Sequence, residues 1–393
     1  MKGKRAREGG GGIIPGLVKL YAWEAAFLMV FAGLYFIATS EGNHQTPDSL
    51  MYVDVARNLR NGAGMVDTSG NPMIYWGPLY PIVLAIGISH LDQYVWWLHL
   101  LCLTGSIWLW LCLSKPYLTP FYYRLFGASL ALSAPMLMIA TFVWSEALFL
   151  LLLSAYLFSL RQFLLNAFPG WLMGATSLGF LCLLQRNAGI FIFLGIFAGL
   201  GLYYRSHPLT KRVCRLLLLH CAVVLIGFTI WNVDRLILGK RLYVLEELIP
   251  QYSLIENGTI VLKELGATLL PAQWSVSVGI ACVAGLLGIS TSRLWQRKKM
   301  HPFLLVLLSA LISYLLTWIL IPAHPDDISR LIAVILPLFY LISWYGIEQT
   351  VKSQSRLPEW VLQWALVSLF VYPVLRTLKN ALFWGGFLGM SPV

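Results

Sequence analysis

The chain has 393 residues, of which 58% are hydrophobic and only 11% are charged, against roughly 25% charged in an ordinary soluble domain. Apolar runs of roughly 20 residues recur along its length, which excludes a soluble protein and predicts an all-α, polytopic membrane protein. The net charge of +11 lies in short basic clusters between these runs, so membrane topology explains it and nucleic-acid binding is excluded.

The basic N-terminus sets the predicted orientation. Residues 1–21 carry five Lys or Arg side chains, which places this tail in the cytoplasm by the positive-inside rule. No small-residue cleavage site follows the first apolar run, 22–39, so we interpret this run as a retained helix and not as a signal peptide. The segment 40–93 is then expected on the outer face.

This first outer segment opens with the polar stretch "HQTPDSLMYVDVARNLRNGAG". Thr46 can cap a helix, Pro47 suits its first position, and Gly62 can end it. Asp48 falls in the first turn, where the positive end of the helix favours a carboxylate. Asp48 is therefore either a simple dipole partner or a functional group, whereas Asp54 lies around the helix and is expected to be structural.

The next apolar segment, 78–90, decides the predicted membrane topology of the chain. It is short and contains two prolines, so we expect an interfacial or re-entrant helix. If it crossed the membrane, the basic clusters at Lys115, Arg124, 211–215 and 297–299 would all lie outside.

This choice predicts about eleven transmembrane helices and four regions. The spans lie near 22–39, 94–113, 125–143, 145–163, 170–185, 188–204, 213–232, 276–293, 302–321, 329–347 and 359–377. The regions are a cytoplasmic tail at 1–21, a seven-helix core at 22–232 that includes the outer loop 40–93, an outer loop at 233–275, and C-terminal helices at 276–393.

Three further charged positions need an explanation, and each has a structural alternative. Glu146 is either a solvated turn residue or part of a cavity, because ionisable groups at such edges are costly to bury. Arg186 is either a snorkelling interfacial side chain or a binding group. Arg330 either forms ion pairs with Asp326 and Asp327 or binds a phosphate, because its planar guanidinium group can donate two parallel hydrogen bonds to phosphate oxygens.

The predicted topology sends these charges to one face, although it was chosen from Lys and Arg clusters alone. Asp48, Glu146, Arg186 and Arg330 all fall outside. Carboxylates and arginines that converge at one membrane face indicate a shared cavity. His324 beside the aspartates is a weak metal signal, and the cysteines show no metal-ligand spacing.

Three motifs now carry a resemblance to a known family. Asp48 and Tyr52 are followed by "ARNLRNGAG" and by Trp76 with "GPLYPIVLA"; Glu146 opens "SEALFLLLL"; and an acidic run leads through Arg330 to "LP". In this order and spacing, the chain resembles the GT-C superfamily of integral-membrane glycosyltransferases, closest to the branch of aminoarabinose transferases and protein O-mannosyltransferases. Many relatives have Asp-Glu where this chain has Asp48-Ser49.

The resemblance implies a function and roles for residues. It implies an inverting glycosyltransferase that moves a sugar from a polyprenyl phosphate to a lipid, glycan or protein hydroxyl, in the plasma membrane with its site facing the exterior. Asp48 would be the general base and Arg330 would bind the phosphate. The other expected substrate-binding residues are Glu146, Arg186, Tyr52, His324, Asp327 and Lys263, with Arg241 as a further helper. No cofactor is expected, although some branches use a divalent metal.

Two other classes remain as alternatives. A lipid-linked-sugar flippase would need polar residues at mid-membrane depth, whereas here they cluster at one face. An O-antigen ligase or polymerase also has a large outer loop, but late in the chain, whereas here the first outer loop is the most structured polar segment.

Overall fold

The computed structural model describes residues 13–73, 76–206, 210–237, 253–271, 273–281, 301–321, 325–354 and 358–388. Within these ranges the chain is helical and forms no strand, only two isolated β-bridges. The helices are α1 (Ile13–Ala38), α2 (Pro47–Arg60), α3 (Leu79–Gly87), η1 (Ile88–His90), α4 (Leu91–Ser114), α5 (Pro120–Ala131), α6 (Ala134–Thr141), α7 (Glu146–Asn166), α8 (Pro169–Gln185), α9 (Gly189–Ser206), α10 (Lys211–Ile237), α12 (Leu254–Ala267), α14 (Pro302–Leu320), α15 (Pro325–Ala333), α16 (Leu336–Gln354), α17 (Glu359–Ser368) and α18 (Val371–Trp384).

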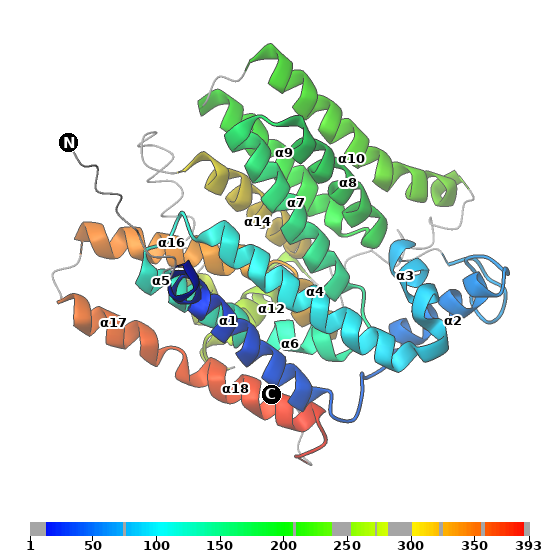
Figure 1. Ribbon diagram of the computed structural model, residues 1–393. Coiled ribbons are helices and arrows are strands. Elements are labelled where there is room, and N and C mark those ends of the chain that lie inside the picture. The colour runs from blue at the N-terminus through cyan, green and yellow to red at the C-terminus, as the bar shows by residue number, and fades with distance from the viewer. Residues whose placement is uncertain are drawn as a thin grey trace, which may run out of the picture.

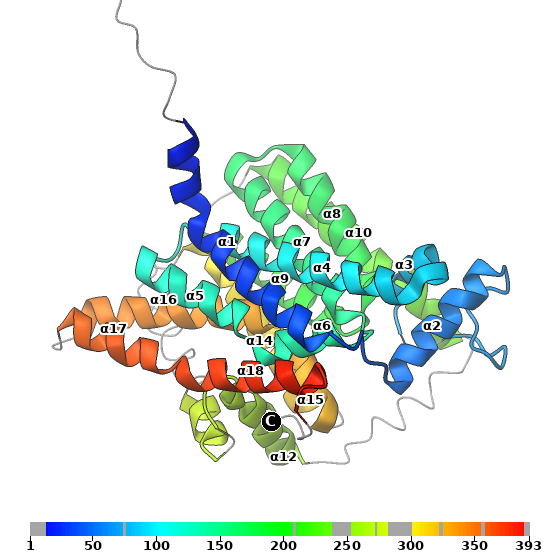
Figure 2. The same ribbon diagram turned by 60° about the horizontal axis from the view of Figure 1, so that its bottom comes forward.

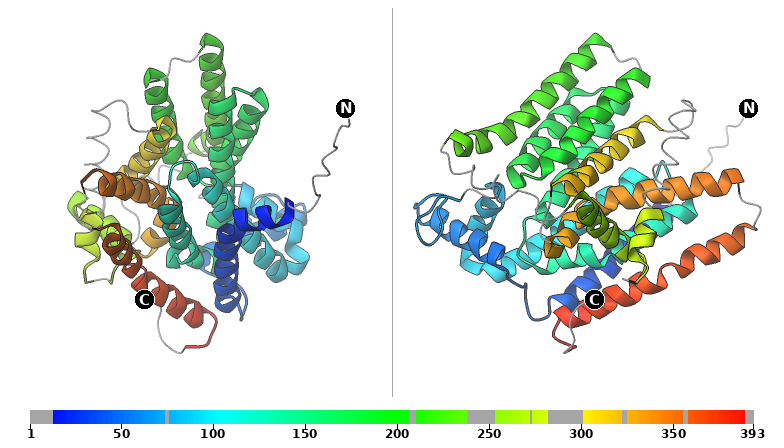
Figure 3. Two further views of the ribbon diagram at one scale, coloured as in Figure 1. Left: turned by 60° about the vertical axis from the view of Figure 1, so that its left-hand side comes forward. Right: turned by 180° about the vertical axis from the view of Figure 1, so that it is seen from behind.

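The long helices pack into one bundle, with α2 and α3 beside each other at one end of it (Figure 1). Helices α7, α8, α9 and α10 form one side of the bundle, and α1 and α18 lie against each other on the opposite side. Helix α12 lies next to α15, near α18 (Figure 2). Helix α14 runs through the bundle and packs against α9 (Figure 3). The predicted all-α fold is confirmed.

Several helices are long and apolar enough to cross a membrane. Among the described residues six helical stretches meet this test, or seven if the bent pair α15–α16 is one span. Two further helices, α1 and α9, contain shorter apolar stretches. Of the predicted span 276–293, the part beyond residue 281 lies outside the described residues.

Three of the predicted spans each contain a break between two helices. Two of them still form one apolar helical stretch long enough to cross a membrane, as predicted: Pro120–Thr141, which is α5 and α6, and Trp360–Trp384, which is α17 and α18. The predicted straight span 329–347 is corrected, because it is parts of α15 and α16 with a 61° bend between them. A proline follows each break: Pro135, Pro337 and Pro373 lie four residues after Ala131, Ala333 and Leu369. A proline ring clashes with the carbonyl four residues earlier and donates no hydrogen bond, so the helix must end there.

The segment 40–93 contains the two helices α2 and α3, as predicted. Gly62 has a φ of +78° directly after α2 and ends it, because a left-handed residue releases the chain from the helix. Helix α3 has nine residues, about 14 Å of helix, which is too short to cross a hydrocarbon core of about 30 Å by itself. It packs mainly on α2 and leads through η1 into α4.

Candidate active site

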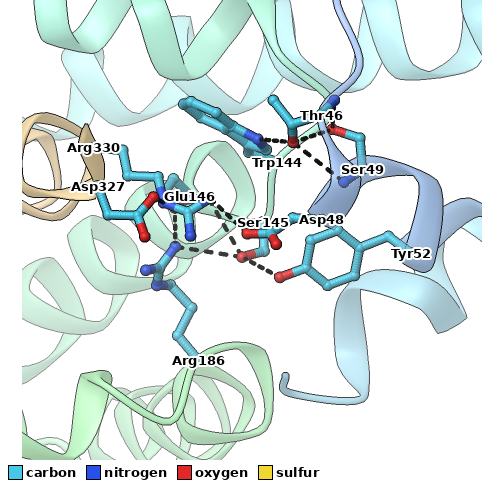
Figure 4. Close-up of polar contacts among 10 residues, drawn as sticks. All are labelled: Thr46, Asp48, Ser49, Tyr52, Trp144, Ser145, Glu146, Arg186, Asp327 and Arg330. Atoms are coloured by element: carbon cyan, nitrogen blue, oxygen red, sulfur yellow. Dashed lines mark hydrogen bonds and ion pairs between the residues drawn. The ribbon is translucent and has the colours of Figure 1, made fainter. Parts of the chain in front are cut away.

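The start of α2 is fixed by a capping box. Thr46 accepts a hydrogen bond from the Ser49 backbone, and the Ser49 hydroxyl accepts one from the Thr46 backbone at 3.0 Å. The Trp144 indole also donates to the Thr46 hydroxyl at 2.9 Å. Ser49 therefore occupies the position that Glu or Gln usually takes in a capping box, and Asp48 beside it is free to face away from the cap (Figure 4).

Asp48 reaches a cluster of charged side chains from three other parts of the chain. Arg330 on α15 lies 2.7 Å from Asp48 Oδ2, 3.1 Å from Asp327 Oδ1 and 3.8 Å from Glu146 Oε1. The Arg330 guanidinium also lies over the Trp144 ring, 5.1 Å from its centre. One arginine thus joins α2, the start of α7 and α15 (Figure 4).

A second arginine approaches the same carboxylate. Arg186, directly after α8, forms an ion pair with Glu146 Oε1 and donates to Ser145 Oγ at 3.4 Å. The Tyr52 hydroxyl donates to the same Ser145 oxygen at 3.3 Å. Gln185 donates from Nε2 to the Ser145 carbonyl at 2.9 Å, so the turn before α7 is held from several directions.

Burial divides the charged groups into an inner and an outer part. The Glu146 side chain is only 2% exposed and Arg186 12%, whereas Asp48 is 25% and Asp327 44% exposed. Burial by itself lowers the pKa of Arg186, but Glu146 outweighs this and raises it above its ordinary value. Burial, and the nearby Glu146 charge, raise the pKa of Tyr52, so its phenol stays a hydrogen-bond donor at neutral pH.

A cavity of about 210 Å³ lies against this cluster. Its lining includes Tyr52, Trp76, Glu146, Gln185, Arg186, Trp318 and Arg330. Aromatic faces and fixed polar groups therefore surround one space next to the start of α7 and the end of α8. Such a concave site with convergent polar groups is a default candidate for ligand binding.

The structure brings together six of the predicted site residues. They are Asp48, Tyr52, Glu146, Arg186, Asp327 and Arg330. Lys263 is not among them: it is exposed on α12, and in the described part of the chain no contact joins it to the cluster. Its neighbour Glu264 accepts a hydrogen bond from Ser329 at 2.5 Å, which ties α12 to α15. His324 and Arg241 lie outside the described residues.

Some residues of the site were not singled out from the sequence. Trp144 carries both the cap contact and the cation–π contact, and Trp318 lines the cavity. The only sequence signal for Trp144 is its place next to "SE", because a tryptophan in an apolar chain is otherwise expected at the interface or in the core. Among the described residues, no group of three or more His, Cys, Asp or Glu side chains is arranged to hold a metal ion.

Comparison with known proteins identifies the fold. No protein-family model and no curated protein matches the chain. The solved structures that match it include ArnT from Cupriavidus metallidurans in the apo state and the same protein bound to undecaprenyl phosphate. The TM-score is 0.57 for both, with 14% and 13% identity, over 94% and 93% of this chain and 75% of each ArnT chain. The chain has the fold of these ArnT structures. This fold and the apolar helices together indicate a multi-pass membrane protein, in which the charged cluster lies beside helix α2.

Proposed function

We propose that the protein is a glycosyltransferase that moves a sugar from a polyprenyl phosphate to an acceptor hydroxyl, with inversion, at the outer membrane–water interface. The observation that carries this proposal is the 2.7 Å ion pair between Asp48 and Arg330 beside the cavity. It places a partly exposed carboxylate, suited to accept a proton, next to a guanidinium suited to bind phosphate. The undecaprenyl phosphate bound to ArnT supports a polyprenyl phosphate as the donor lipid.

The two outer groups would act in sequence. The Arg330 guanidinium binds the donor phosphate and stabilises its charge as the sugar leaves. The phosphate competes with Asp48 for Arg330, which releases the carboxylate to accept the proton of the acceptor hydroxyl. Arg186 lies deeper and assists with the phosphate, and the Asp327 carboxylate orients Arg330 from the same helix.

Glu146 has a different part in this proposal. The family resemblance implies a substrate-binding residue at this position, but its burial and its ion pair with Arg186 favour a role in orienting the site. A carboxylate that is 2% exposed neutralises the two guanidinium groups and keeps both directed at one space. The Tyr52 hydroxyl contacts the same turn through Ser145 and keeps α2 against α7.

The direct test replaces Asp48. Asp48→Asn removes the proton acceptor but keeps the shape, so the release of undecaprenyl phosphate from an undecaprenyl-phosphate sugar should fall about 10²–10⁴-fold. The matched control is Asp54→Asn on the same helix, whose carboxylate is bound only to the exposed Arg57 at 3.3 Å and should leave the rate unchanged. Transfer near the wild-type rate in folded Asp48→Asn protein would overturn the assignment of Asp48 as base.

A second test addresses the phosphate. Arg330→Ala should weaken the binding of undecaprenyl phosphate by about tenfold or more, because a charge-assisted hydrogen bond to an anion is lost. Binding is measured with the protein in lipid nanodiscs. Arg57→Ala on the exposed face of α2 is the control. An unchanged affinity in Arg330→Ala would mean that Arg330 is a structural ion-pair partner only.

A further inference from the structure

A second cavity lies between the last turns of α9 and the first turns of α10. Its volume is about 350 Å³, and it is lined by two short rows of residues, Phe197, Gly201 and Tyr204 on α9 and Cys214, Leu218 and Cys221 on α10. The described residues that line it include no charged side chain. A Cβ at Gly201 would meet no atom within 4 Å, so this glycine leaves the space open. The cavity is therefore suited to an apolar chain.

This cavity lies far from the charged cluster around Arg330. Helix α9 begins three residues after Arg186 and runs for 18 residues, about 27 Å, to its other end. The last turns of α10 are beside the candidate site instead, because the Trp231 indole donates to the Trp76 carbonyl at 3.0 Å. The end of α9 and the start of α10 therefore point away from α2 and α3 (Figure 1). The positive-inside rule predicts this end of the bundle on the cytoplasmic side.

Basic side chains follow the cavity lining on both helices. Arg205 lies four residues after Gly201, and Lys211 lies three residues before Cys214, so both continue the helix faces that line the cavity. The nearby basic residues are all exposed: Arg205, Lys211, Arg212 and Arg215. The sequence contains no Asp or Glu between residues 147 and 233, so no carboxylate of α8 or α9 compensates these four cations. The charge beside the cavity is strongly positive.

Basic residues elsewhere on the predicted cytoplasmic side have partners within the protein. Lys115 forms an ion pair with Glu24 at 3.0 Å, and Lys352 forms one with Glu348. In the part of the chain that the structure describes, no carboxylate pairs with the four basic residues beside the cavity. The positive-inside rule explains why cations lie on this side. It does not explain why these four gather beside an apolar cavity without a counter-charge.

We propose that this cavity binds an acyl chain of an anionic phospholipid and that the four basic residues bind the lipid phosphate. The acyl chain fills an apolar space at the depth of the hydrocarbon, and basic side chains at a membrane surface attract anionic headgroups. A zwitterionic lipid fills the cavity but gains less from the cations, and a free phosphate leaves the cavity empty. The site does not depend on the proposed function, because it is separate from the charged cluster.

The first test uses the full-length wild-type protein in detergent. Native mass spectrometry measures the affinity for dioleoylphosphatidylglycerol and for dioleoylphosphatidylcholine, which have the same acyl chains. The anionic lipid should bind at least about tenfold more tightly, and an equal concentration of inorganic phosphate should not displace it. A phosphatidylglycerol with a photoreactive diazirine in its acyl chain should label peptides that contain residues 197–204 or 214–221. Equal affinities, displacement by phosphate, or labelling of other peptides only would overturn the proposal.

The headgroup contact is tested with Arg205→Ala/Lys211→Ala. This variant should lose affinity for phosphatidylglycerol by at least about tenfold and keep its affinity for phosphatidylcholine, because only the charge interaction is removed. The matched control is Arg57→Ala/Arg60→Ala, which removes the same charge from exposed positions of α2 and should keep the wild-type preference. A folded Arg205→Ala/Lys211→Ala protein that keeps the preference would overturn the assignment of the headgroup site.

The acyl-chain contact is tested with Gly201→Phe, whose ring enters the open space without meeting a protein atom. It should weaken the binding of both lipids at this site and abolish the photolabelling of residues 197–204 and 214–221. The matched control is Gly33→Phe on α1, another exposed helical glycine whose Cβ would have no neighbour within 4 Å, but which lines no part of this cavity. Labelling and affinity that are the same in both variants would overturn the proposal.

Discussion

Arg330 and Glu146 show how single residues organise this site. Arg330 lies within 4 Å of three carboxylates from three segments, and Glu146 lies between two guanidinium groups. A buried charge is tolerated only when partners compensate it, so these side chains depend on one another. The sequence predicted each as a candidate, with a structural alternative for each. The distances show that the two alternatives coincide: Arg330 and Glu146 form ion pairs, and the same side chains line the cavity.

Replacing Glu146 should therefore affect stability strongly. Glu146→Gln removes the carboxylate that compensates Arg186 and Arg330, and the free energy of unfolding should fall by about 3–5 kcal/mol, the usual cost of breaking a buried ion pair. Denaturation in detergent measures this change. Asp327→Asn is the comparison, because an exposed partner contributes only about 0–1 kcal/mol. Equal effects of the two variants would contradict the central position of Glu146.

Prolines and glycines decide the structure at the scale of helices. Each break in these three predicted spans is followed by a proline, four residues after the end of α5 and of α15 and five residues after the end of α17. Hydrophobicity averaged over a span does not register this local clash, and so the prediction joined the pieces. The break before Pro337 has a consequence for the site, because the 61° bend between α15 and α16 sets the direction of the helix that carries Arg330.

Glycines allow a close contact between helices α9 and α14. A Cβ at Gly195 would lie 2.4 Å from the Ser309 carbonyl oxygen, and one at Gly199 would lie 2.6 Å from the Val306 Cα. Small residues four apart allow such approach of two membrane helices. Gly195→Leu should separate them and lower the free energy of unfolding by at least about 2 kcal/mol, measured by detergent denaturation. Gly201→Leu, where no atom lies within 4 Å, should change little; a similar loss in both would refute the packing argument.

At the scale of the whole molecule, the C-terminal helix α18 is hydrogen-bonded to the segment between α1 and α2. His44 donates from Nε2 to the Trp384 carbonyl at 3.0 Å, and Ser40 donates to the Gly385 carbonyl at 2.8 Å. Thr377 on α18 donates to the Leu132 carbonyl, in the break between α5 and α6, at 2.6 Å. Residues more than 240 positions apart thus fix the segment that leads into α2 and Asp48.

Removal of the C-terminal helices should weaken this arrangement. Deletion of residues 358–393 removes all three hydrogen bonds and uncovers α1, so the Tm in detergent should fall by about 4–10 °C. Sugar transfer should fall too, because the chain before Asp48 loses its support. Trp360→Ala changes an exposed side chain on α17 and serves as the control. A truncated protein with wild-type Tm and activity would show that these helices are dispensable.

The sequence by itself determined the fold class and the helices α2 and α3, and it singled out six residues that the structure brings together. It could do so because hydrophobic runs, capping patterns and charged residues are local in the sequence. A membrane strongly penalises charges inside it, so these patterns are pronounced in a membrane protein. Only the tertiary structure decided which groups meet: that Asp48 binds Arg330, that Trp144 supports both, and that Lys263 stays apart. These contacts join segments far apart in the chain, and their geometry depends on helix breaks and packing distances that no local pattern specifies. The cavity between α9 and α10 likewise became visible only when the two helices were in place.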